Sequence, residues 1–148
     1  MLKITDALTA EHRVFLDLFT QVERSLPDLT TVAEVRLLAV LLERLLESHA
    51  DTERNLAYAA LDHVLRHEGR LDRMHQDHQE IDATLARIRE TEDFSEARRL
   101  LRTAIGTSRD HFRLEELQLF PLLEQTLLPD TLVALGDARL HAPALRAV

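Results

Sequence analysis

Residues 49–62 read HADTERNLAYAALD, and residues 111–124 read HFRLEELQLFPLLE. The two stretches align without gaps, and each opens with a histidine that is followed four residues later by a glutamate. Because side chains four positions apart lie on the same face of an α-helix, each stretch places an imidazole and a carboxylate side by side. The repeat therefore predicts two similar helices that contribute the same pair of groups to one structure.

Apolar side chains recur at helical spacing in four long segments, which turn-forming residues separate. The second segment begins at Thr31, and Glu34 three residues on completes a capping-box pattern. Ser95 is the expected N-cap of the fourth segment, and Pro27 and Pro129 end the first and the fourth. In chain order the four stripes are Leu8, His12, Phe15, Phe19, Val22 and Leu26; Val35, Leu38, Leu42, Leu45, His49 and Leu56; Leu71, Met74, His78, Ile81, Leu85 and Ile88; and Leu101, Ala104, Ser108, His111, Glu115, Leu119 and Leu122.

These stripes predict an all-α fold, an up-down-up-down four-helix bundle, because four apolar faces joined by short links are typical of such bundles. Only 3 Gly and 4 Pro interrupt the 148 residues, which favours helices throughout. We expect a single domain over residues 1–148, with the bundle at about 5–127 and a short fifth helix and tail at 130–148. The apolar side chains of the fifth helix are Leu132, Val133, Leu135 and Leu140.

Each stripe contains one histidine, and the four are His12, His49, His78 and His111. Residues on consecutive antiparallel helices lie at the same height when the turn falls midway between them in sequence. The midpoint of the first two histidines falls in the turn at 27–31, and the midpoint of the last two falls in the turn at 91–95. The sequence therefore predicts that the histidines of each helical hairpin lie level with one another.

The connection between the second and third helices is less clearly marked. The midpoint of the second and third histidines falls just after Asp62, whereas the obvious helix breaker is Gly69. We therefore expect the second helix to end near Asp62 and residues 63–69 to form an irregular connection. On this interpretation His63 and His67 lie away from the main cluster, despite their own i, i+4 spacing.

Composition excludes several classes of function. The formal net charge of −8 offers no attraction for phosphate backbones or anionic membranes, so we expect neither nucleic acid nor membrane as a partner. The chain has no cysteine, which excludes disulfides, thiolate metal sites and thiol nucleophiles. No apolar run approaches the length of a membrane span or resembles a signal peptide, so we expect a cytoplasmic protein.

The histidines of the apolar stripes and the glutamates beside them indicate a bound cation. A single histidine on an apolar helix face is usually a hydrogen-bonded core residue, but four at one height, with two glutamates beside them, are different. The stripes contain no Lys or Arg near Glu53 and Glu115, so burial would leave two negative charges desolvated, at a cost of several kcal/mol per ion. A metal site in the bundle core supplies the missing positive charge.

The donor set favours two metal ions. Six side chains exceed the three protein ligands of a catalytic zinc, and imidazoles do not suit calcium or magnesium, which take oxygen. The expected ligands are His12 and His49 on one ion, His78 and His111 on the other, and Glu53 and Glu115 bridging both, with a water-derived bridge. Imidazole and carboxylate with an open position suit iron, with manganese or zinc as substitutes. Iron with an open position binds dioxygen or related diatomics.

The pattern resembles the hemerythrin-like (HHE cation-binding) family. The resemblance rests on an isolated histidine on the first and third helices, on His-x-x-x-Glu on the second and fourth, and on Glu115-Glu116-x-x-x-Phe120-Pro121. It covers residues from about 5 to 127 and implies a four-helix bundle with a non-heme di-iron site. Carried over position by position, it implies the same six ligands, namely His12, His49, Glu53, His78, His111 and Glu115.

This chain departs from the family pattern at two places. Oxygen-carrying members have a fifth histidine one turn from the ligand on the third helix, and here His75 stands three residues before His78 instead. Those members also have an aspartate five residues after the fourth-helix histidine, where this chain has Glu116 after Glu115. Members that repair iron–sulfur centres carry a cysteine-bearing N-terminal region, whereas this chain has no cysteine.

Five further side chains near the motifs have open roles. His75 is an additional candidate ligand, a hydrogen-bond partner of a ligand, or a solvated residue. Glu116 faces solvent or hydrogen-bonds a ligand, and His141 is expected to be solvated. Tyr58 and Phe112 are interpreted as core residues, with the lining of a small-molecule pocket as the alternative.

We expect a protein that binds dioxygen, or senses oxygen, nitric oxide or peroxide, at two iron ions. One alternative is a di-iron redox enzyme that reduces peroxide or nitric oxide or repairs iron centres. Another is a structural or interaction module that the metal only stabilises. Ferritin-like sites use Glu-x-x-His, which is absent, Asp72-x-x-His75 being the nearest match. A monomer and a homodimer are both compatible with the sequence.

Overall fold

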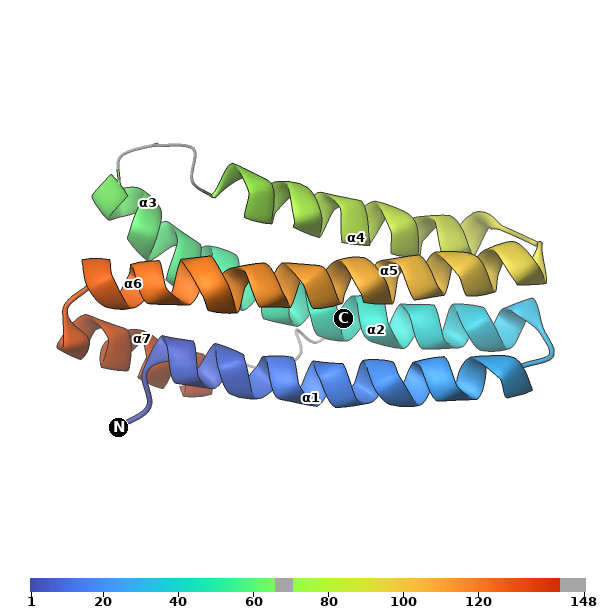
Figure 1. Ribbon diagram of the computed structural model, residues 1–148, viewed down its shortest axis with the longest axis horizontal. Helices are drawn as coiled ribbons and strands as arrows, with labels where there is room; N and C mark the ends of the chain where they lie inside the picture. Colours follow the sequence, from blue (N-terminus) through green and yellow to red (C-terminus); the bar gives the residue numbers. More distant parts are fainter. Residues whose placement is uncertain (66–70, 142–148) are drawn as a thin grey trace.

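The computed structural model describes residues 1–65 and 71–141, and within these residues the chain is helical and contains no strand. Four antiparallel rods form the bundle, and the connections α1–α2 and α4–α5 lie together at one end (Figure 1). The helices of the first hairpin are α1 (Ile4–Ser25), a 3₁₀ turn η1 (Leu26–Asp28), α2 (Val32–Thr52), a π-helical segment η2 (Glu53–Tyr58) and α3 (Ala59–Leu65). Those that follow are α4 (Asp72–Glu90), α5 (Phe94–Leu114), a π-helical segment η3 (Glu115–Leu119), α6 (Phe120–Thr126) and α7 (Pro129–His141). The predicted all-α bundle with a short fifth helix is confirmed.

The turns at the shared end form from local hydrogen bonds. The Thr31 hydroxyl accepts the Glu34 backbone N–H at 3.3 Å, and the Glu34 carboxylate accepts the Thr31 N–H at 2.8 Å, which confirms the capping box. The expected N-cap at Ser95 is wrong. Asp93 caps α5 instead, accepting the backbone N–H of Glu96 at 2.8 Å, and its negative charge also suits the positive end of the helix.

The core consists of two apolar clusters, one toward each end of the bundle. In the first three rods the predicted histidine falls between the two clusters along the chain, whereas in α5 His111 directly precedes Phe112, the last residue of the first cluster in that rod. In α1, for example, His12 lies between Leu8 of one cluster and Phe15 of the other. The same order holds in α4, where His78 lies between Met74 and Ile81. The fold therefore surrounds a polar layer with apolar packing on both sides.

Three details of the sequence predictions are wrong, two of them in the apolar faces and one at the end of a helix. Leu45 is 39% exposed and Leu46 takes its place in the core, where the buried positions of α2 include Val35, Ala39, Leu42, Leu46 and His49. Leu140 is 62% exposed. The second rod continues to Leu65 rather than ending near Asp62, since its helical hydrogen bonds persist through that stretch.

Of the two histidines assigned to that connection, His63 lies away from the main cluster, as predicted, and is exposed. His67 and Gly69 lie outside the described residues.

The fifth helix, α7, packs against α1 through a residue that the sequence analysis did not single out. Gly136 is buried, and a Cβ atom placed on it would lie 2.1 Å from the backbone oxygen of Leu2. Only glycine allows this approach, because any side chain would overlap the N-terminal backbone. Leu132 buries the remaining apolar contact of α7, so the helix is fixed to the bundle rather than free.

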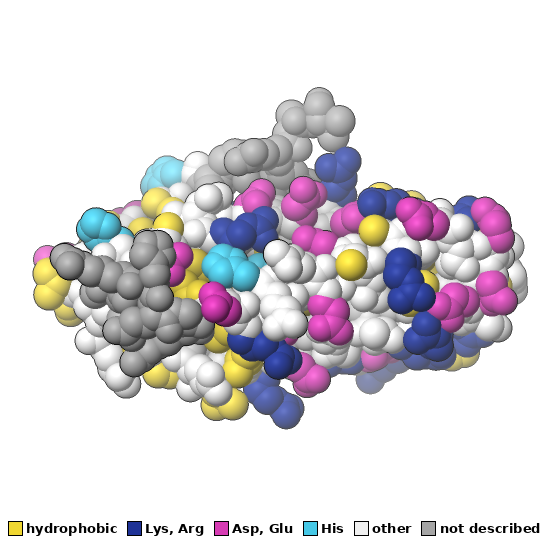
Figure 2. Space-filling view, turned by 90° about the horizontal axis from the view of Figure 1, so that it is seen from above, with side chains coloured by type: hydrophobic (Ala, Val, Ile, Leu, Met, Phe, Trp, Pro, Cys, Tyr) yellow, Lys and Arg dark blue, Asp and Glu magenta, His cyan; other side chains and the backbone are white. Residues whose placement is uncertain are grey.

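The surface carries charges of both signs. The face seen in Figure 2 intersperses Lys and Arg with Asp and Glu along the bundle, and smaller hydrophobic areas are also visible on it. Among the described residues, no helix combines the length and the apolar character that crossing a membrane requires.

Candidate metal centre

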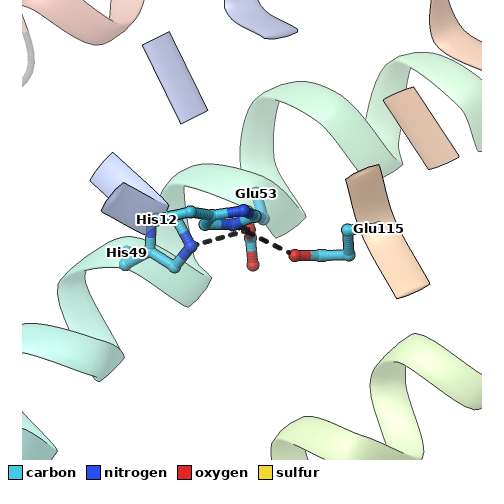
Figure 3. A group of neighbouring side chains, drawn as sticks. All are labelled: His12, His49, Glu53 and Glu115. Carbon is cyan, nitrogen blue, oxygen red and sulfur yellow. Dashed lines mark ion pairs between the residues drawn. The ribbon is translucent and has the colours of Figure 1, made fainter. Parts of the chain in front are cut away.

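The structure brings together all six side chains that were predicted as ligands. Each is buried, and the most accessible of them, His78, is only 7% exposed. They form two groups of four whose ligand atoms lie within 4.8 Å of one another. The first group, drawn in Figure 3, is His12, His49, Glu53 and Glu115, and the second is Glu53, His78, His111 and Glu115. Each group thus holds the two histidines of one hairpin, and both groups share the two glutamates.

Both glutamates begin a π-helical segment. The segment η2 starts at Glu53 and η3 starts at Glu115, immediately after the helices that carry the histidines. Such wider turns are rare and are frequently found at functional sites. The sequence analysis expected uninterrupted helices. In the second repeat Pro121, two residues past η3, was a usable signal, because proline removes a backbone donor inside a helix. The first repeat has Ala59 at the aligned position and gives no such signal.

The Glu53 carboxylate reaches histidines of both hairpins. Its Oε1 lies 2.8 Å from His49 Nε2 and 3.5 Å from His12 Nε2. Its Oε2 lies 3.1 Å from His78 Nε2. The two oxygens of one carboxylate therefore face the two groups separately, which is the geometry that a bridging ligand requires.

The Glu115 carboxylate repeats this arrangement. Its Oε2 lies 3.4 Å from His12 Nε2, and its Oε1 lies 3.3 Å from His111 Nε2. The Tyr58 hydroxyl donates to the same Oε1 at 2.5 Å. Burial and the two nearby glutamates raise the pKa of Tyr58, so the phenol stays protonated and orients Glu115 as a hydrogen-bond donor.

Most of the inward-facing atoms lie within ion-pair distance of one another, but among the described residues they form no hydrogen bond of acceptable geometry. The buried atoms without a partner include His12 Nε2, His49 Nε2, His111 Nε2, both oxygens of Glu53 and Glu115 Oε2. Buried polar atoms are nearly always paired, because leaving one unpaired costs about 1–3 kcal/mol. Six such atoms around a common centre fit a bound cation, and imidazole nitrogens with carboxylate oxygens are ligands that transition metals accept.

The electrostatics show what balances the carboxylates when protons alone are present. Burial lowers the pKa of His12 and of His49, but the adjacent carboxylates outweigh it and raise the two values to about 9 and about 10. The pKa of His111 is also raised, mainly by Glu115 against the effect of burial. Burial alone would raise the pKa of Glu53, but His49, His12 and His78 hold it well below its ordinary value. The site therefore concentrates negative charge that protons or metal cations must neutralise.

In each hairpin, the outward-facing nitrogen of the histidine on the second helix lies close to a carboxylate from the first helix. His49 Nδ1 lies 2.7 Å from Glu11 Oε2, and Arg139 of α7 donates to the other oxygen of Glu11 at 2.6 Å. In the other hairpin, His111 Nδ1 lies 3.4 Å from Asp77. A proton on Nδ1 that is shared with a carboxylate leaves Nε2 free to bind a metal and fixes the orientation of the ring.

The contacts of Glu11 with His49 and of Asp77 with His111 were not predicted, although the sequence contains a pattern that indicates them. Glu11 and Asp77 occupy the same place in the two hairpins, one residue before His12 and His78. Each reaches across to the histidine of the next helix rather than to its own neighbour. The role of Glu116 was left open in the sequence analysis. Its carboxylate oxygen Oε1 lies 2.9 Å from His12 Nδ1, so Glu116 hydrogen-bonds a candidate ligand.

The other histidines in the described part of the chain, His63, His75 and His141, lie outside both groups. His75 is half-buried, and its ring meets the edge of the Tyr58 ring with centroids 5.2 Å apart. It contacts the site through Tyr58 and Glu115 instead of joining either group of four. His141 is exposed at the end of α7, as predicted.

A small cavity adjoins the site. Its volume is about 20 Å³, which is room for about one water molecule or a diatomic ligand. Phe112 lines the cavity and also stacks on His12, with ring centroids 4.0 Å apart, so it both packs the core and shapes the pocket. The other lining residues are Leu46, His49, Ala50, His78, Ile81, Asp82 and His111.

Comparison with known proteins agrees with this geometry. The model of the hemerythrin HHE cation binding domain matches residues 3–123, close to the span of the resemblance found in the sequence. No curated protein and no solved structure gave a match. The family match covers most of the chain and contains all six buried donors, so this chain belongs to the hemerythrin HHE cation-binding domain family.

Proposed function

We propose that this protein holds two iron ions and binds dioxygen, or senses oxygen, nitric oxide or peroxide, at that pair. His12 and His49 would hold one ion, and His78 and His111 would hold the other. Glu53 and Glu115 would bridge them. The observation that carries the proposal is that both glutamates belong to both groups of four donors.

The donor chemistry favours iron. Two imidazoles with carboxylate oxygen and an open position are typical of non-heme ferrous sites, whereas manganese and zinc are substitutes that the same ligands accept. A pair of ferrous ions, when bound, supplies electrons to a diatomic ligand. Four protein donors per group leave room for that ligand, and the adjoining cavity has the volume for it.

The protein's own residues prepare the site for binding rather than for exchange with solvent. Apolar side chains, among them Leu46, Ile81 and Phe112, line the cavity and keep bulk water away from the histidines. The Tyr58 hydroxyl holds Glu115 in place, and Glu11 holds His49. A buried site whose ligands are held by hydrogen bonds suits reversible binding of a small uncharged ligand.

Metal analysis and absorption spectroscopy test the proposal. Protein loaded anaerobically with ferrous iron is expected to hold two ions per chain and to develop ligand-to-iron charge-transfer bands when oxygen or nitric oxide is added. A protein that holds only zinc after iron loading, or that shows no such band after oxidation, would contradict it.

The same preparation separates the proposed function from the alternatives. A carrier or sensor binds and releases its ligand without consuming reductant, so steady turnover with an electron donor would favour a redox enzyme instead. Metal that stabilises the fold while the loaded protein ignores oxygen, nitric oxide and peroxide would favour a purely structural role.

A further inference from the structure

The cavity beside the metal centre opens to the surface at one charged residue. Seven of its eight lining side chains are buried, and the eighth, Asp82 of α4, is exposed. The carboxylate of Asp82 therefore lies at the solvent-facing side of the cavity that His49, His78 and His111 also line.

Acidic groups surround this opening. Glu47 and Asp51 of α2 lie near enough to Asp82 to act on its charge, as do His78 and Arg54. Arg54 donates to Asp51 at 2.6 Å, so these two charges offset each other and Asp82 and Glu47 supply the remaining negative charge. The opening therefore has a negative potential, which draws cations toward it and raises their local concentration.

The lining also contains buried imidazole nitrogens that are available to bind a metal ion. His49 Nε2 and His111 Nε2 form no hydrogen bond of acceptable geometry among the described residues, and both side chains are more than nine-tenths buried. A route that begins at a carboxylate and ends at unpaired imidazole nitrogens offers a cation successively stronger donors.

We propose that this opening is the entrance through which divalent cations reach the two donor groups, and that Asp82 captures them there. The inference rests on the proposed metal function of the site. The cavity has the volume of about one water molecule, so an arriving ion must shed most of its hydration shell. The Asp82 carboxylate supplies an oxygen that replaces lost water at the step where dehydration begins.

A second acidic hollow on the surface does not serve this purpose. A larger groove between α1 and α6 has a volume of about 550 Å³ and contains Asp6, Glu116 and Glu124. Its lining includes none of the six donors, and the fully buried ring of His12 stands between Glu116 and the centre. The groove therefore ends at the outer side of a histidine rather than at the atoms that bind metal.

The rate at which metal-free protein takes up Co²⁺ tests the proposal, because cobalt absorption bands report ligation as it occurs. In stopped-flow mixing at low ionic strength, Asp82→Asn is expected to slow second-order loading on the order of tenfold. Asp82→Glu should restore the wild-type rate, and the difference should largely vanish in 1 M salt, where the Debye length is about 3 Å. The final number of ions per chain should not change.

Asp17→Asn is the matched control, since it removes the same charge from an exposed position on α1 that does not line the cavity. It should load at the wild-type rate. Equal low-salt rates for Asp82→Asn and the wild type would overturn the entrance, and so would an Asp82→Asn protein that loads normally but holds fewer ions, because Asp82 would then be part of the site itself. A wild-type protein that takes up no cobalt would instead contradict the proposed function.

Discussion

Removing one histidine should remove one metal ion and leave the other. His49→Leu deletes a donor that belongs to the first group only, so the second group keeps all four of its donors. The change leaves no buried charge unpaired, because Glu11 keeps its bond from Arg139 at 2.6 Å and Glu53 Oε1 still faces His12 at 3.5 Å. The expected metal content therefore falls from two ions per chain to one.

The loss in stability follows from the loss of one bound ion. A site held at one hundred times its Kd contributes about 2.7 kcal/mol to the free energy of unfolding. For a chain of this size that corresponds to a decrease in Tm of about 5–11 °C. Glu53→Gln, in contrast, weakens both groups at once, since Glu53 belongs to both, and should remove both ions and about twice the stabilisation.

Metal analysis after dialysis, together with thermal unfolding at a fixed excess of ferrous iron, measures both quantities. Circular dichroism of each metal-free variant is the control for folding. A His49→Leu protein that still holds two ions, or a Glu53→Gln protein that holds as many ions as His49→Leu, would refute the division into two groups that share their glutamates.

Three further predictions concern the support of the site. Gly136→Ala should destabilise the protein by about 1–3 kcal/mol in urea unfolding, because the new Cβ would lie 2.1 Å from a backbone oxygen. Gly106→Ala, whose Cβ would have no neighbour within 4 Å, should stabilise the protein by about 1 kcal/mol. Equal effects of the two changes would contradict the packing of α7. Arg139→Gln should weaken metal binding by the group that contains His49 on the order of 10–100-fold in chelator competition, because Arg139 holds Glu11 and Glu11 holds His49. Arg139→Lys should recover much of the lost affinity. An unchanged affinity in Arg139→Gln would show that the contact through Glu11 is only structural. Metal-free protein should be most stable between about pH 4.5 and 6.5. Histidines with pKa values raised to about 9 and about 10 contribute stability in full below 6.5 and lose it as the pH rises through those values, while the lowered pKa of Glu53 contributes stability above 4.5 that is lost as the pH falls; stability that increases from pH 7 to 10 without metal would contradict this.

The height of the buried donors could be predicted because it depends on counting residues. The turn after His12 and the turn after His78 each lie midway to the next histidine, so helices of regular rise must place the pairs level. The i, i+4 spacing then brings each glutamate to the same face. Nothing about side-chain conformation was needed for that step.

The details that failed depend on choices between near neighbours. Leu45 and Leu46 are both leucines at the margin of the α2 stripe, and only the packing of the other helices decides which one is buried. Asp93 and Ser95 are both good caps two residues apart, and the backbone conformation selects Asp93.

The outer contacts of the site could not be derived from helix periodicity alone. Glu11 lies at the edge of the apolar face of α1, and its partners His49 and Arg139 come from two other helices. Long-range contacts of this kind depend on how α7 packs against the bundle, which in turn depends on the close approach at Gly136. The repeated acid before His12 and His78 was the available signal.

Anomalous X-ray scattering from crystals of the iron-loaded protein, recorded at the iron edge, tests the central claim most directly. Two peaks are expected, one among the nitrogens of His12 and His49 and one among those of His78 and His111, each within bonding distance of both Glu53 and Glu115. A single peak, or peaks that contact only one of the two glutamates, would contradict the account.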